Sequence, residues 1–255
     1  GSGHIQRMTN LVVYLNQQDN IDAYIINKKK PDFLNPEHLN YFSSSILNNS
    51  DLIIRDMRDS ETLEIDKLKE SGKVMVIDDL GSGRELANYK VNLLPSKNIQ
   101  NYNKDYFIYG YNFTQSLQSL NLKTISKEID IAIYPGTGHS ENLDQLLKSI
   151  PTNLKIAILG VKNPYIMQNN VNKPIEIPYS QILLSSKILL SHFGITLFEA
   201  YIAKCKLNSL NPSNYHPDLV NLIKDEMDVL NLGLWESFNN YNFLIEEINN
   251  FQNKE

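Results

Sequence analysis

The stretch from Ile188 to Ala203 constrains the fold more than any other part of the chain. Its first three residues are apolar, which is typical of the end of a buried strand. Residues 191–194 (Ser-His-Phe-Gly) predict a turn, and the residues from Ile195 onward carry apolar side chains at helical spacing. The stretch therefore predicts a strand, a glycine-containing turn and a helix, which is the repeating unit of α/β proteins.

This turn also predicts an anion site, because the first turn of a helix has free N–H groups and a partial positive charge. Gly194 and Thr196 lie at the predicted start of the helix. Glu199 lies about one helical turn further along, where a carboxylate can accept hydrogen bonds from ribose hydroxyls. The alternative is an ordinary strand–helix unit in which the glycine only eases the turn and Thr196 caps the helix.

Short apolar runs alternate with amphipathic segments along the rest of the chain. Predicted strands cover residues 22–26, 51–54, 73–77, 91–94, 129–134, 154–159, 188–190 and 206–210, with an edge segment at 174–178 because of its prolines. Predicted helices cover residues 8–17, 36–47, 61–70, 141–149, 179–186, 195–203, 218–230 and 236–251. Strands separated by helices imply parallel sheets with helices on both faces.

Residues 95–126 are polar, irregular and rich in Asn and Tyr, so we interpret them as the crossing between two such units. We therefore predict an α/β fold with an N-terminal domain over residues 1–113 and a C-terminal domain over residues 114–255. In open parallel sheets, ligands bind beyond the carboxyl ends of the strands. The polar clusters fall at those ends, which favours a cleft between two Rossmann-like domains; they are residues 1–7, 56–59, 78–84, 135–140 and 191–196. The alternative is that these are ordinary loops, which open sheets place there in any case.

Composition excludes several classes of function. The net charge of −5 leaves no global basic field, so we expect no nucleic-acid partner. The single cysteine, Cys205, excludes an intrachain disulfide or a cysteine metal cluster, and the adjacent acids Asp78 and Asp79 lack further ligands at metal-binding spacing. No apolar run approaches the ~20 residues of a membrane span and no signal peptide is visible, so we expect a cytoplasmic protein. We expect no metal and no cofactor, and a monomer or weak homodimer.

A series of short motifs runs through the chain in order. They are Gly1-x-Gly3-His4-x-x-Arg7, Asp51–Asp56, Val74–Asp79, Tyr109–Phe113, Ile133–Gly138, the 188–203 stretch with Glu199, and Asn214. Together they resemble the nucleotide-sugar hydrolases of the pseudaminic acid pathway. These enzymes act on UDP-2,4-diacetamido-2,4,6-trideoxy-β-L-altropyranose and release the free sugar and UDP. The resemblance implies the two-domain glycosyltransferase-B (GT-B) architecture, a UDP-sugar substrate, and a nucleotide held by the second domain.

The sequence departs from the family pattern at several positions. Tyr215 stands where the family usually has Gln, and residues 193–196 replace a more Ser-rich turn. His139 falls close to the position of the family's loop aspartate, with one residue of apparent insertion.

The resemblance implies that His4 is the catalytic base. A histidine is suited to this task because its ordinary pKa of ~6.5 leaves it mostly neutral at cytosolic pH, and the positive end of a helix favours the neutral form. Gly3 would allow close approach of the substrate, and Arg7 is expected to pair with the substrate or with a carboxylate of its own domain. One of the strand-end acids could orient His4 or bind sugar hydroxyls and acetamido groups; they are Asp56, Asp59, Asp78 and Asp79, of which we choose Asp56 and Asp79 as site residues. The alternatives are an N-cap role for His4, a surface Arg7, and helix capping by the acids.

In the second domain, Gly136, Thr137 and Gly138 predict a turn whose backbone amides face a diphosphate, although the run is too short for a P-loop. By resemblance, Asn214 contributes to the nucleotide site. Two other functions stay open: a GT-B glycosyltransferase that uses a nucleotide-sugar donor, and a non-catalytic binder of nucleotide sugars. A basic, apolar-edged face on the first domain would favour the transferase.

Overall fold

The structure is a computed structural model that describes residues 2–25, 50–94, 111–118, 120, 125–136, 140–238 and 245–247. The chain divides into two compact units, Gly1–Lys104 (unit 1) and Asp105–Glu255 (unit 2). The predicted boundary between residues 113 and 114 falls inside a helix, α3 (Tyr111–Leu117), within a segment predicted to be irregular. The predicted helix at 36–47 lies outside the described residues.

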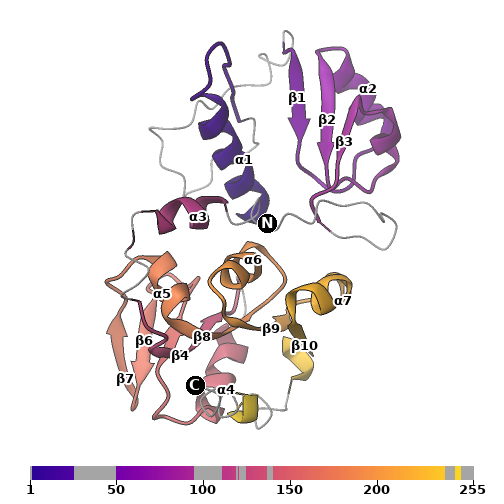
Figure 1. Cartoon of the computed structure of the whole chain (residues 1–255). Helices are drawn as coiled ribbons and strands as arrows, with labels where there is room; N and C mark the ends of the chain where they lie inside the picture. Colours follow the sequence, from indigo (N-terminus) through magenta and orange to yellow (C-terminus); the bar gives the residue numbers. More distant parts are fainter. Residues whose placement is uncertain are drawn as a thin grey trace. The chain divides into compact units, whose positions relative to one another are not determined.

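Unit 1 is a small parallel α/β structure (Figure 1). Its elements are α1 (Ser2–Leu15), β1 (Leu52–Arg55), α2 (Thr62–Lys69), β2 (Lys73–Ile77), the 3-10 helix η3 (Ser82–Leu86) and β3 (Tyr89–Val91). The three strands pair in parallel in the order β1-β2-β3. Helix α2 covers one face, because its Ile65 is buried against Val74 and Val76 of β2.

Helix α1 begins earlier than predicted, at Ser2 and not at residue 8. The apolar stripe explains the longer helix, because Ile5, Met8 and Val12 follow one another at helical spacing and pack together around Ile25. The strand predicted at residues 22–26 is wrong over its described part, since only Ile25 forms an isolated bridge. The longer α1 places His4 and Arg7 on a helix rather than in a loop before it.

Unit 2 is built around a seven-stranded sheet in the order β10-β9-β8-β4-β5-β6-β7. Its strands are β4 (Ile129–Tyr134), β5 (Ile156–Ile158), β6 (Tyr165–Gln168), β7 (Val171–Pro174), β8 (Ser186–Ser191), β9 (Lys206–Asn211) and β10 (Val229–Leu234). Its other helices are α4 (Ser140–Ser149), α5 (Tyr179–Ser185), α6 (Ile195–Ile202), α7 (Tyr215–Met227) and the 3-10 helix η5 (Trp235–Ser237). Strands β10, β9, β8, β4 and β5 are parallel, whereas β6 and β7 form an antiparallel hairpin at the edge.

Two features of unit 2 correct the sequence prediction. The sheet is not wholly parallel, because residues 165–174 form the β6–β7 hairpin where only an edge segment was expected at 174–178. The helix predicted to run to Leu230 ends at Met227, because Asp228 adopts a left-handed conformation with φ 52°. Val229 then pairs with Leu207 and starts β10.

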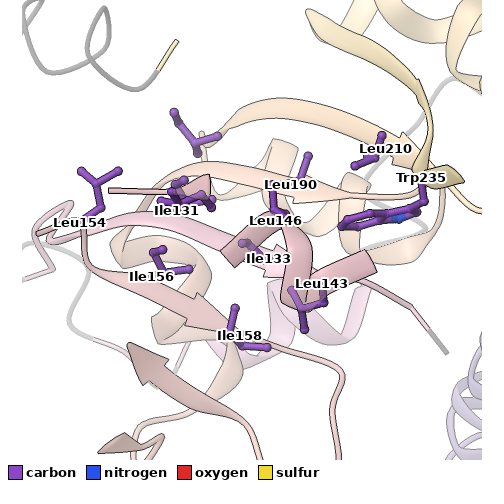
Figure 2. Close-up of a cluster of buried hydrophobic side chains, with 12 residues drawn as sticks. Ile131, Ile133, Leu143, Leu146, Leu154, Ile156, Ile158, Leu190, Leu210 and Trp235 are labelled. Atoms are coloured by element: carbon purple, nitrogen blue, oxygen red, sulfur yellow. The ribbon is translucent and has the colours of Figure 1, made fainter. Parts of the chain in front are cut away.

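The core of unit 2 lies between the sheet and α4 (Figure 2). Alternate residues of the central strands point to the same face, so Ile131, Ile133, Ile188 and Leu190 pack together against α4. Helices α5 and α6 lie on the opposite side of the sheet (Figure 1). In the described part of the chain, no helix is both long enough and apolar enough to cross a membrane.

The strand order reverses direction between β4 and β8. From β4 the chain passes outward to β5, and from β8 it passes outward the other way to β9 and β10. In open parallel sheets this switch point leaves a crevice at the carboxyl ends of the two central strands, where ligands bind. Those ends are Tyr134 and Ser191.

Candidate functional site

In unit 1, four charged or polar side chains meet at the carboxyl ends of β1 and β2. His4 and Arg7 lie one turn apart on α1, so they share a face of the helix. Asp56 follows β1 and Asp78 follows β2, and these strands are parallel neighbours whose ends lie side by side. Gly3 lies in the same first turn of α1 as His4.

Asp56 is the centre of this cluster. Its Oδ1 atom lies 2.8 Å from His4 Nδ1 and accepts a hydrogen bond of 2.5 Å from Arg7 Nη2. Its Oδ2 atom accepts a bond of 2.8 Å from Arg7 Nε, which completes a two-pronged pair between guanidinium and carboxylate. Arg7 Nη1 donates in turn to Asp78 Oδ2 at 3.1 Å. Arg7 therefore bridges the ends of both strands.

This arrangement selects one tautomer of His4. If Nδ1 carried a lone pair, that lone pair would face a carboxylate oxygen only 2.8 Å away, which is repulsive. Nδ1 therefore carries the proton and donates it to Asp56, and in the neutral ring Nε2 carries the lone pair. The His4 side chain is 31% exposed and that of Asp56 only 2%, so the histidine can reach a ligand while the aspartate stays behind it.

Burial raises the pKa of the Asp56 carboxyl, but the hydrogen bonds from His4 and Arg7 and the charge of Arg7 outweigh that effect. The net result is a pKa below the ordinary value, so Asp56 is a carboxylate at neutral pH. Arg58 also faces this cluster, and burial lowers the pKa of its guanidinium despite the nearby charges of Asp78 and Asp59.

The two adjacent acids at the end of β2 have different roles. Asp78 joins the cluster, and its Oδ1 atom accepts the backbone N–H groups of Leu93 and Leu94 at 2.6 and 2.7 Å. Asp79 is fully buried and turns away from the cluster, where its carboxylate accepts backbone N–H groups of Ser60 and Gly81 and contacts Arg55. Asp79 therefore organises loops, and Asp78, the acid of this pair that we did not choose from the sequence, stands next to Arg7.

In unit 2, aromatic rings gather at the carboxyl ends of β4, β8 and β9. The ring of His192 lies 5.9 Å from that of Tyr134 and 5.8 Å from that of His216, measured between centroids. Tyr215 stands 5.6 Å from His216 on the far side, at the start of α7. This row of rings lies at the switch point of the sheet, where β4 and β8 pair.

Glu199 belongs to a second polar cluster beside these rings. Its Oε2 atom accepts a hydrogen bond of 2.7 Å from the hydroxyl of Tyr179 on α5, and Tyr179 Oη lies 3.3 Å from Thr196 Oγ1. Burial raises the pKa of the Glu199 carboxyl, although the bond from Tyr179 opposes the shift. Burial also raises the pKa of the Tyr134 phenol, and the charge of Glu199 adds to that effect.

The glycines at this edge differ in what the structure demands of them. Gly136 has φ +79° and an added Cβ would lie 3.0 Å from the His192 ring, so both conformation and space require glycine. Gly194 is extended, with φ 168°, and an added Cβ would make only an ordinary contact at 3.6 Å. Thr137 and Gly138 lie outside the described residues. Asn214 is exposed and precedes α7, where its side chain makes no capping bond.

The predicted site residues therefore fall into two groups, one in each unit. His4, Arg7 and Asp56 come together in unit 1, with Gly3 next to His4 in α1. In unit 2, Thr196 and Glu199 both contact Tyr179, and Gly136 and Gly194 lie next to the ring of His192. From the sequence we considered Asp78 but chose Asp79 in its place, and we missed Tyr134 and Tyr179 as members of these clusters. Within the described segments, no group of three or more His, Cys, Asp or Glu side chains is arranged to hold a metal ion.

Comparisons of the chain with protein-family models, with curated proteins and with solved structures found no match. Function is therefore inferred from the geometry of the two clusters.

Proposed function

We propose that the chain is a cytoplasmic nucleotide-sugar hydrolase that cleaves a UDP-linked amino-deoxy sugar to the free sugar and UDP, in a nonulosonic acid pathway of the pseudaminic type. In this proposal the two units are the two Rossmann-like domains of a GT-B-like enzyme. Unit 1 supplies the base and unit 2 binds the nucleotide.

The observation that carries the proposal is the pair formed by His4 and Asp56. A buried carboxylate that accepts Nδ1–H orients the imidazole and stabilises the imidazolium that forms when Nε2 takes a proton. Arg7 holds this carboxylate with two hydrogen bonds, so the pair is fixed before any ligand arrives. Such an arrangement is suited to activating a water molecule.

The proposed reaction balances without a cofactor. Water attacks the anomeric carbon while His4 Nε2 takes one of its protons. The bond between the anomeric carbon and the glycosyl oxygen breaks, and UDP leaves with the electron pair. The imidazolium then returns its proton to solvent or to the departing diphosphate.

Unit 2 supports the nucleotide half of the proposal. The start of α6 has no side-chain cap and no acidic residue in its first turn, so its free N–H groups suit a diphosphate. It follows β8 at the switch point, next to the end of β4. Glu199 lies about one turn along the same helix, and its carboxylate can accept hydrogen bonds from ribose hydroxyls.

The test is hydrolysis of a UDP-linked diacetamido-trideoxy sugar in water enriched in oxygen-18. We expect UDP release, with the label in the free sugar and none in UDP. His4→Gln should lower kcat by at least about a hundredfold, because general base catalysis contributes a factor of this order. Asp59→Asn, which changes an exposed acid near the same strand end, is the matched control and should keep the wild-type rate. Wild-type rates from His4→Gln, or label in UDP, would refute the proposal.

One observation favours a glycosyltransferase as the second candidate. Met57 and Leu80 follow the acids at the ends of β1 and β2, and they are 61% and 44% exposed. Exposed apolar side chains at these strand ends would suit an apolar or lipid-linked acceptor in place of water. Product analysis separates the two functions, because a transferase consumes donor only when an acceptor is added, whereas a hydrolase turns over in buffer alone.

A further inference from the structure

Tyr179 links helices α5 and α6 of unit 2 through its hydroxyl. It begins α5 and its side chain reaches α6, where its hydroxyl contacts both Glu199 and Thr196. More than a third of the residue remains exposed, at 37%. A phenylalanine would fill the same space, so the function of the hydroxyl lies in its hydrogen bonds.

The directions of these bonds follow from the proton count. A phenol has one proton, and the short contact of 2.7 Å to a carboxylate uses it. The 3.3 Å contact with Thr196 therefore has the threonine hydroxyl as donor and the phenolic oxygen as acceptor. The result is a chain of hydrogen bonds from Thr196 through Tyr179 to Glu199. In this chain the Thr196 hydroxyl donates its proton to Tyr179 and not to a phosphate.

This chain fixes one oxygen of Glu199 and leaves the other. Among the described residues, Tyr179 is the hydrogen-bond partner of Oε2, and Oε1 receives no bond. A free glutamate side chain samples several rotamers, and holding one of them costs side-chain entropy. Because Tyr179 has already fixed the carboxylate, that entropy need not be lost when a ligand hydroxyl binds to Oε1.

We propose that Tyr179 is a positioning residue that holds Glu199 Oε1 for the 2′-hydroxyl of the ribose, and that it thereby sets the preference for ribonucleotides over 2′-deoxyribonucleotides. The inference rests on the proposed function, since it requires a uridine nucleotide at the start of α6. It goes beyond that function because it assigns sugar selection to a residue on a different helix from the carboxylate. Tyr179 itself need not touch the nucleotide.

The experiment compares the binding of UDP and 2′-deoxy-UDP to the full chain by titration calorimetry. The wild type should bind UDP more tightly than 2′-deoxy-UDP. Tyr179→Phe should weaken UDP binding about tenfold, the equivalent of one hydrogen bond, and leave 2′-deoxy-UDP binding nearly unchanged. The ratio of the two affinities should therefore fall towards one. Glu199→Gln should lower the same ratio without changing Tyr179.

Tyr165→Phe is the matched control, because it removes a phenolic hydroxyl from β6 of the same sheet. It should keep the wild-type ratio. Circular dichroism and thermal unfolding show whether each variant is folded. The ratio of the two affinities does not change if part of the protein is inactive. An unchanged ratio in Tyr179→Phe would overturn this inference and leave the proposed function standing. Failure of the wild type to bind either nucleotide would overturn both.

Discussion

Replacement of Asp56 by Asn tests the cluster in unit 1 with little change in side-chain shape. One carboxylate oxygen becomes an amino group, which cannot accept a hydrogen bond. If it replaces Oδ1, the bonds from His4 and Arg7 Nη2 are lost, and if it replaces Oδ2, the bond from Arg7 Nε is lost. A hydrogen bond to a charged group contributes about 1.5–3 kcal/mol. The guanidinium, only 18% exposed, also loses its nearest counter-charge.

We therefore expect Asp56→Asn to lower the free energy of unfolding of unit 1 by about 2–4 kcal/mol at neutral pH. The two units can be followed separately in one urea titration. The single tryptophan, Trp235, lies in the core of unit 2, so its fluorescence reports that unit, while far-ultraviolet circular dichroism reports both. The variant should lower the midpoint of a dichroism transition and leave the fluorescence midpoint in place.

The pH dependence of this effect has a definite sign. The folded state lowers the pKa of Asp56 below its ordinary value of 3.8, so the stabilisation is complete above that value and is lost as the pH falls through the folded pKa. The difference between wild type and Asp56→Asn should therefore shrink below about pH 4. Asp59→Asn, at an exposed position, is the control. A difference under about 0.5 kcal/mol at neutral pH, the size of an ordinary surface substitution, would refute the reasoning.

Three further predictions concern unit 2. Gly136→Ala should destabilise unit 2 by about 1–3 kcal/mol, because Gly136 has a positive φ and lies close to the His192 ring. Gly194→Ala should leave the unfolding midpoint of unit 2 unchanged, and it should weaken UDP binding if a diphosphate approaches that turn. Glu199→Gln should stabilise unit 2 at neutral pH but not at pH 4. Folding raises the pKa of Glu199, so its carboxyl lowers the stability of unit 2 as the pH rises through the pKa of the folded state. Thermal unfolding at both pH values checks this. Cys205 is buried with a pKa raised to about 11, so its reaction with a disulfide reagent at pH 8 should be slow in the native protein and fast in urea.

The sequence predicted strands best where an apolar run is bounded by polar residues. Strands β2 and β4 have the predicted bounds, because each is short, apolar and followed at once by acids or a turn. Strand β10 was missed because Val229–Leu234 continues the apolar spacing of the preceding helix, and only the left-handed Asp228 ends that helix. A left-handed aspartate has no reliable sequence signal.

The sequence predicted that Arg7 pairs with the substrate or with a carboxylate of its own domain, and the structure pairs it with Asp56 and Asp78. The sequence could not decide between Asp78 and Asp79. Alternation along β2 would put residue 78 on the face of Val74 and Val76, under α2. The positive φ of Asp78, 52°, breaks that alternation and turns its carboxylate towards Arg7.

One buried asparagine, Asn211, fixes the turn of the candidate nucleotide site. Asn211 ends β9, and its Oδ1 atom accepts the N–H of Phe193 at 3.1 Å, directly before Gly194. Its amide group donates to the carbonyl of Gly233 at 3.2 Å, so one side chain links the β8–α6 turn to β10. This contact depends on β9 lying between β8 and β10, an order that no local pattern specifies. The turn before α6 is therefore fixed by Asn211 of β9, a strand that follows α6 in the chain. For this reason the 188–203 stretch alone predicted the turn but not the side chain that fixes it.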